Sequence, residues 1–285
     1  MQVSLFASAV RPKLWESFLK SLENTIVKYE VIFAGNADNP IYLYNDKVKY
    51  FFTKNIKPAQ CYEIARRECT GEVVVWVADD CEFPNNVIGH AYRYWKSQNN
   101  DKLILSIQTK ESGYNLPEGT LFDMNLHRFF GGVNNTPLMA PLGMMSRTFL
   151  NELGGIDRRY VCGQYENDIV MRAYTKGATV EIFGNEDCFI DIDHLGKSMF
   201  IGESTTEESF LKRPFASGYK QDRTILENSW TIFNEKKLIE ILDQGRYEVH
   251  LEEVKDIVTT QIDQFEPYSD PISLTHSESN RGQWE

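Results

Sequence analysis

The stretch Val73-Val-Val-Trp-Val-Ala78 runs directly into Asp79-Asp80-Cys81-Glu82. A strand that is apolar at every position is normally buried on both faces, as in a parallel sheet covered by helices. The carboxylates then lie at the carboxyl end of the strand, where open α/β sheets bind their ligands. Clustered carboxylates repel one another, and Mg²⁺ or Mn²⁺ prefer such oxygen ligands. The stretch predicts a buried strand that ends in a metal site, with a phosphate-bearing substrate on the metal.

The direction of the acidic side chains allows two interpretations. In an extended chain Asp80 and Glu82 point to the same side, because side-chain direction repeats every two residues. The pair could then approach one cation. Acidic residues just before Pro84 could instead favour the dipole of a helix that begins there. The motif alone leaves both interpretations open.

Strand and helix signals alternate on both sides of this stretch. Helices are expected to begin at Pro12, Pro58 and Pro84. Strands are expected at 2–7, 29–33, 47–52, 73–78, 102–108, 141–146 and 178–183. Further helices are expected at 148–153 and 167–176, with a loop at 113–137. This alternation predicts an α/β fold with a mainly parallel sheet and right-handed crossovers. After about Ser198 the chain is more polar, and helical spacing returns only at 238–242 and 249–262.

Size and charge restrict the class of protein. The chain has 285 residues, a formal charge of −11 and a hydrophobic content of 42%, which suits one large domain or a domain with an appended subdomain. The acidic balance disfavours nucleic acid as a partner. The five cysteines form no CxxC pair, and the first twenty residues do not resemble a secretory leader. With no apolar stretch near the ~20 residues that span a bilayer, we expect a soluble, cytoplasmic protein.

A second group of residues follows near position 160. Gly154-Gly155-Ile156-Asp157 suits a tight turn that approaches a ligand closely. In Glu166-Asn167-Asp168, one carboxylate could act as the general base for a hydroxyl nucleophile. Alternatively, Asp168 and Arg172 form an ordinary helical ion pair, since they are four residues apart.

A third group is Asp191-Ile192-Asp193-His194. His194 could complete a metal site, since imidazole suits Mn²⁺ better than Mg²⁺, or it could be structural. Lys57 and Lys197 are candidates for contact with a diphosphate, although most lysines only solvate a surface. Aromatic side chains such as Trp230 could stack on a sugar ring or be buried in the core.

The order of these motifs resembles the GT-A-fold, mostly inverting, nucleotide-sugar glycosyltransferases. The similar segments are VSLFASAVRPKLWESFLKSL (3–22), YEVIFAGN (29–36), AQCYEIARRECTGEVVVWVADDCEFP (59–84), GGIDRRY (154–160), ENDIVMR (166–172) and DIDHLGKS (191–198). The resemblance implies a GT-A-like mixed, mainly parallel sheet flanked by helices. It implies a glycosyltransferase domain at 1–198, with a donor half at 1–109 and an acceptor half at 110–198. Residues 199–285 would form a mainly helical C-terminal extension.

The resemblance also assigns roles to single residues. Asp80 matches the metal-binding aspartate, Glu82 stands where an aspartate is more usual, and His194 helps to hold the metal or the diphosphate. The nucleotide-sugar pocket would include Ala7, Ser8, Asn36, Arg66, Asp79 and Lys197, with Asp79 contacting the ribose. The chain departs from the family at Ala34-Gly35-Asn36, where an acidic residue is usual. Asp168 and Glu166 are both candidates for the base, with Asp168 slightly ahead.

The implied reaction is a metal-dependent transfer with inversion, with Mn²⁺ or Mg²⁺ as cofactor. The donor would be a nucleotide-diphosphate sugar, preferably a UDP-sugar. The acceptor would be a glycan or another hydroxyl-bearing molecule, and peripheral membrane contact stays open. One alternative is a sugar nucleotidyltransferase, which normally needs a Gly-rich loop near the first strand. Residues 8–12 contain Arg11 but no glycine. Another alternative is a non-catalytic nucleotide-sugar-binding protein.

Overall fold

The computed structural model describes residues 1–36, 46–53, 57–110, 138–192, 216–230 and 265–267. The predicted loop at 113–137, the predicted helices at 238–242 and 249–262, and the candidates His194 and Lys197 lie outside these residues.

A seven-stranded sheet forms the centre of the fold, in the order β3-β2-β1-β4-β7-β5-β8. All neighbouring strands are parallel except β7, which runs antiparallel to β4 and β5. The strands are β1 (Val3–Ser8), β2 (Tyr29–Gly35), β3 (Val48–Phe52), β4 (Val73–Trp76), β5 (Leu103–Ile107), β7 (Gly143–Ser146) and β8 (Thr179–Phe183). This architecture confirms the predicted α/β fold with a mixed, mainly parallel sheet.

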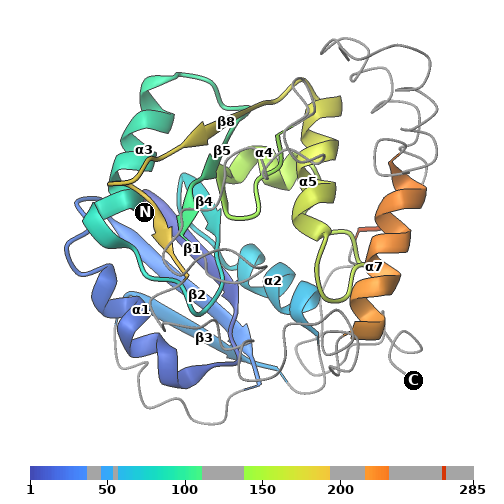
Figure 1. Ribbon diagram of the computed structural model, residues 1–285, viewed down its shortest axis with the longest axis horizontal. Coiled ribbons are helices and arrows are strands. Elements are labelled where there is room, and N and C mark those ends of the chain that lie inside the picture. The colour runs from blue at the N-terminus through green and yellow to red at the C-terminus, as the bar shows by residue number, and fades with distance from the viewer. Residues whose placement is uncertain (37–45, 54–56, 111–137, 193–215, 231–264, 268–285) are drawn as a thin grey trace.

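Helices cover both sides of the sheet in Figure 1, with α1 and α3 on one side and α2, α4 and α5 on the other. Their bounds are α1 (Trp15–Ser21), α2 (Pro58–Arg67), α3 (Val87–Ser97), α4 (Arg147–Glu152) and α5 (Tyr165–Thr175). Short 3-10 turns at Pro12–Leu14 and Pro84–Asn86 precede α1 and α3, so the prolines begin these segments as predicted. Each of the expected helices within the described residues is present.

Aromatic side chains pack α1 onto the sheet. The Trp15 and Phe33 ring centroids are 5.1 Å apart, and the Phe18 and Phe83 centroids are 4.9 Å apart. All four side chains are buried. Because Trp15 and Phe18 lie just after β1, and Phe83 just after the acidic motif, this packing fixes the loops at the carboxyl ends of β1 and β4 against each other.

Two features differ from the expectation. β4 ends at Trp76, and a turn closed by a hydrogen bond from the Cys81 amide to the Ala78 carbonyl (3.3 Å) follows it. The acidic motif is therefore not a continued strand. The second difference is the position of α7 (Ala216–Ser229): this helix lies within the predicted mainly helical extension, but no sequence signal located a helix at these residues. It lies outside α5 in Figure 1.

A second, two-stranded sheet pairs β6 (Thr109–Lys110) with β9 (Ile190–Asp191). Among the described residues, no helix combines the length and the apolar character needed to span a membrane.

Candidate active site

Asp79 lies at the carboxyl edge of the sheet and is fully buried. Its carboxylate accepts hydrogen bonds from the backbone amides of Val10 and Arg11, both at 2.7 Å, and from the indole of Trp15 at 3.1 Å. These donors all come from the loop and helix that follow β1. Asp79 therefore holds that loop in place, and its predicted contact with a ribose stays a prediction.

Arg11 joins the two aspartates of the motif. Its Nε donates to Asp79 Oδ1 at 2.6 Å, and its two terminal nitrogens form ion pairs with Asp79 and Asp80. Burial opposes the charge of the guanidinium, but the two carboxylates outweigh this effect and raise the pKa of Arg11. Two aspartates and one arginine leave this Asp79–Arg11–Asp80 cluster with a formal charge of −1.

Glu82 connects the acidic motif to a segment more than a hundred residues away. Its amide donates to the Asp191 carbonyl at 2.8 Å, and the Asp191 amide donates to the Glu82 carbonyl at 2.9 Å. The tertiary structure thus brings the acidic motif at 79–82 next to Asp191. Asp191 lies three residues before His194 in the chain. The Glu82 side chain accepts a hydrogen bond from the Ser17 hydroxyl on α1, and its role as a metal ligand stays a prediction.

The expected Mg²⁺ or Mn²⁺ can be tested against these donors. In the part of the chain that the structure describes, no three His, Cys, Asp or Glu side chains form a group that could hold an ion. Asp80 is nevertheless a carboxylate at the sheet edge, and it forms an ion pair with the Arg11 side chain. Proteins often hold Mg²⁺ with one or two carboxylates while substrate phosphates complete the shell. The donor set fits an ion that arrives with a phosphate.

Three predicted donor-site residues meet at the same edge. Ala7 and Ser8 end β1, Ser8 pairs with Ala34 of β2, and Asn36 follows β2 directly. The unusual glycine at position 35 also has a physical reason. A Cβ there would lie 1.8 Å from the carbonyl oxygen of Ala9, so the two backbones can approach only at glycine.

Arg66, by contrast, is occupied by packing contacts near the end of α2. Its guanidinium donates to both carboxylate oxygens of Glu63 at 2.7 Å and to the Asn151 side chain at 2.5 Å. Glu63 also accepts the amide of Ile156 at 3.0 Å. This buried network joins α2 to the Gly154-Gly155 turn, and donor contact by Arg66 stays a prediction.

The paired glycines approach the protein's own side chains. Gly154 and Gly155 have φ values of 87° and 78°. A Cβ at Gly154 would lie 2.6 Å from the Phe265 ring, and one at Gly155 would lie 2.7 Å from Arg66 Nε and from Glu63 Oε2. The predicted tight turn is present, and the side chains of Glu63, Arg66 and Phe265 fill the space around it.

Asp168, the first candidate for the base, is 2% exposed. One carboxylate oxygen accepts from Arg172 Nε and the other from Trp230 Nε1, both at 2.8 Å. Arg172 also donates to the Leu153 and Gly155 carbonyls. The helical ion pair is therefore present, and it ties α5 to the glycine turn.

Glu166, the second candidate, lies in the first turn of α5 and is partly exposed. Burial raises the pKa of Glu166 to about 7, and the charge of Asp222 adds to this effect. A carboxylate that titrates near neutral pH suits a general base. The choice between Glu166 and Asp168 as the base stays a prediction.

Asp222 is a residue that sequence reasoning did not single out, and Trp230 takes the second of its two predicted alternatives, burial. Asp222, on α7, is fully buried and accepts the backbone amides of Val161, Cys162 and Gly163 at 2.9, 2.6 and 2.9 Å. Trp230 is buried against Asp168 and does not offer its ring to a sugar. Two buried contacts from the predicted extension thus hold the segment that carries Glu166. A polar helix with few apolar positions offers no periodic signal that would reveal them.

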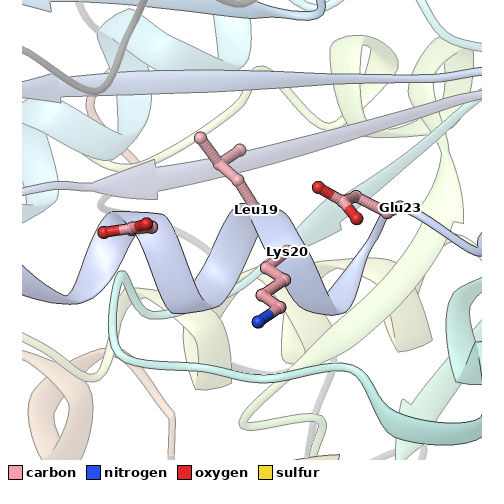
Figure 2. Close-up of a pocket in the computed structure, with 4 residues that line it drawn as sticks. Leu19, Lys20 and Glu23 are labelled. Carbon is pink, nitrogen blue, oxygen red and sulfur yellow. The ribbon is translucent and has the colours of Figure 1, made fainter.

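One shallow hollow lies on the outer side of α1, lined by Glu16, Leu19, Lys20 and Glu23. Figure 2 shows these side chains along the helix. None of the predicted site residues lines it, so we assign it no role.

The protein thus has an α/β fold with a mixed, mainly parallel sheet, whose carboxyl edge carries the acidic motif. Neither the protein-family models nor the curated proteins include a match. Among solved structures, the fold is similar to that of the glycosyltransferase TarS from S. aureus. TarS 1–349 has a TM-score of 0.52 and 14% identity, over 89% of this chain and 77% of that chain.

Two further TarS structures give comparable values. The complex of TarS 1–349 with UDP-GlcNAc has a TM-score of 0.53 and 15% identity, over the same shares of both chains. The longer TarS chain has a TM-score of 0.52 and 13% identity, over 80% of this chain and 42% of its own length. At this level of identity the similarity establishes the fold.

Proposed function

We propose that the protein is a glycosyltransferase that moves a sugar from a nucleotide-diphosphate sugar, preferably a UDP-sugar, to an acceptor hydroxyl. The observation that carries this proposal is the Asp79–Arg11–Asp80 cluster at the carboxyl edge of a TarS-like sheet. TarS itself binds UDP and UDP-GlcNAc, and ligands of open α/β sheets bind at this edge.

The donor would lie across the ends of β1 and β2, near Ala7, Ser8 and Asn36. Asp80 would hold Mn²⁺ or Mg²⁺ together with the two phosphates, and Glu82, His194 and Lys197 stay predicted partners of the ion or the diphosphate. The ion would supply Lewis-acid stabilisation of the charge on the departing diphosphate.

Glu166 would remove the proton of the acceptor hydroxyl. Its place in the first turn of α5 leaves it partly exposed, whereas both oxygens of Asp168 are occupied. Attack from the face opposite the leaving diphosphate is a single displacement that inverts the anomeric centre, unlike the two-step route through a covalent sugar.

The loop after β1 disfavours a sugar nucleotidyltransferase. In such an enzyme, loop amides would bind the substrate phosphates. Here the amides of Val10 and Arg11 donate to Asp79.

The proposal is tested by incubating the protein with a panel of nucleotide sugars and Mn²⁺. We expect release of a nucleoside diphosphate from one donor, as transfer or as slow hydrolysis. D80N and E166Q should each lower this rate by about 100-fold or more, while E152Q, on the exposed end of α4, should retain it. Pyrophosphate release would indicate nucleotidyl transfer instead, and binding without turnover would indicate a binding protein.

A further inference from the structure

Arg11 has a position that the proposed reaction does not by itself explain. The side chain is 17% exposed and lies between two carboxylates that are almost completely buried. Buried carboxylates need a compensating charge, and the guanidinium supplies it. Arg11 therefore occupies the place at Asp80 that a divalent cation would need.

The contacts of Arg11 with the two aspartates are not equivalent. Asp79 accepts Nε and one terminal nitrogen of Arg11, and it also accepts the Arg11 backbone amide. Asp80 accepts the other terminal nitrogen of the same guanidinium. The contact with Asp80 can thus be exchanged while Asp79 still holds the guanidinium.

Charge decides when such an exchange is favourable. A divalent ion that binds at Asp80 without a phosphate would lie beside the positively charged guanidinium of Arg11. Repulsion between the two positive charges would weaken the binding of the ion. A diphosphate brings several negative charges and removes this opposition. The terminal nitrogen released from Asp80 can then donate to a phosphate oxygen, a pairing that guanidinium groups favour.

We propose that Arg11 couples metal binding to donor binding: it occupies Asp80 in the donor-free protein and admits a divalent cation only together with a diphosphate. This inference rests on the proposed function. Thermodynamic linkage then requires that UDP and Mn²⁺ strengthen each other's binding by the same factor.

The experiment measures Mn²⁺ binding by calorimetry, with and without UDP, in the wild-type protein and in R11Q. In the wild type we expect Mn²⁺ alone to bind at least about 10-fold more weakly than Mn²⁺ with UDP. In R11Q we expect Mn²⁺ alone to bind about 10-fold more tightly than in the wild type, so that the coupling factor with UDP shrinks.

R159Q is the matched control. Arg159 is 15% exposed and pairs with the buried Asp157 at 2.6 Å, so the substitution removes the same kind of ion pair elsewhere in the molecule. Its Mn²⁺ affinity should equal that of the wild type. R11K, which keeps a positive charge with fewer donors, gives a second variant in case R11Q does not fold. Its Mn²⁺ affinity should lie between those of the wild type and R11Q.

Two results would overturn different claims. If the wild type binds Mn²⁺ alone as tightly as with UDP, or if R11Q and R11K bind Mn²⁺ no better than the wild type, Arg11 does not control the cation. The proposed function would survive that result. If UDP with Mn²⁺ does not bind to any variant, the proposed function fails, and the inference about Arg11 fails with it.

Discussion

The hydrogen bond between Trp230 and Asp168 makes a quantitative prediction about how the C-terminal helix is held. The substitution W230F deletes the indole N–H that donates to Asp168 Oδ1 at 2.8 Å and retains an aromatic ring. Both residues are 2% exposed, so water cannot replace the lost donor. A hydrogen bond to a charged group contributes about 1.5–3 kcal/mol, against about 0.5–1.5 kcal/mol for a neutral pair.

W95F provides the reference for the smaller ring. Trp95 is also buried, and its indole donates to the neutral carbonyl of Leu103 at 3.0 Å. The loss of ring volume is the same in both variants, so it cancels in the comparison. We therefore expect the free energy of unfolding to fall by about 1 kcal/mol more in W230F than in W95F.

The measurement is urea unfolding followed by far-ultraviolet circular dichroism, since removal of a tryptophan alters the fluorescence. Both variants should show the wild-type dependence on urea concentration, which indicates an unchanged unfolding transition. Equal losses in the two variants, or a smaller loss in W230F, would refute the conclusion that this bond holds α7 on α5.

Three further predictions concern Glu166, Asp222 and Gly155. Because the pKa of Glu166 is raised to about 7, the rate of sugar transfer should fall as the pH drops through 7. A pH–rate profile without this limb would exclude Glu166 as the base. Burial raises the pKa of Asp222 from its ordinary 3.8 to about 6, so its contribution to stability is present below pH 3.8 and is lost as the pH rises through 6. Relative to D222N, the wild type should lose about 2 kcal/mol between pH 4 and pH 7 in chemical unfolding, and a constant difference would contradict this. G155A should destabilise by more than G177A in the same assay, since both glycines have φ near 78° but only Gly155 has side chains within 4 Å of an added Cβ. Equal losses would show that the neighbours of Gly155 adjust freely.

Local periodicity was enough to predict the architecture. The fully apolar 73–78 stretch indicated a central strand, and β4 is buried at every position between β1 and β7. Proline positions and apolar spacing located α1, α2 and α3, because these signals act within a few residues along the chain. The acidic residues after β4 could likewise be placed at the carboxyl edge, since a strand's direction determines where its end lies.

Only the tertiary structure decided the partners of those acidic residues. Asp79 and Asp80 are bound by Arg11, 68 and 69 positions away, and Asp168 by Trp230, 62 positions away. Glu82 turns to Ser17 because the turn at residues 78–81 interrupts the strand alternation on which its predicted direction depended. Contacts of this kind arise from burial and charge compensation between distant segments, and neither leaves a periodic trace in the sequence. The sequence thus determined the fold and the edge of the sheet at which Asp79 and Asp80 would lie. The folded structure determined the ion pairs of these two carboxylates and the partial exposure of Glu166 on α5.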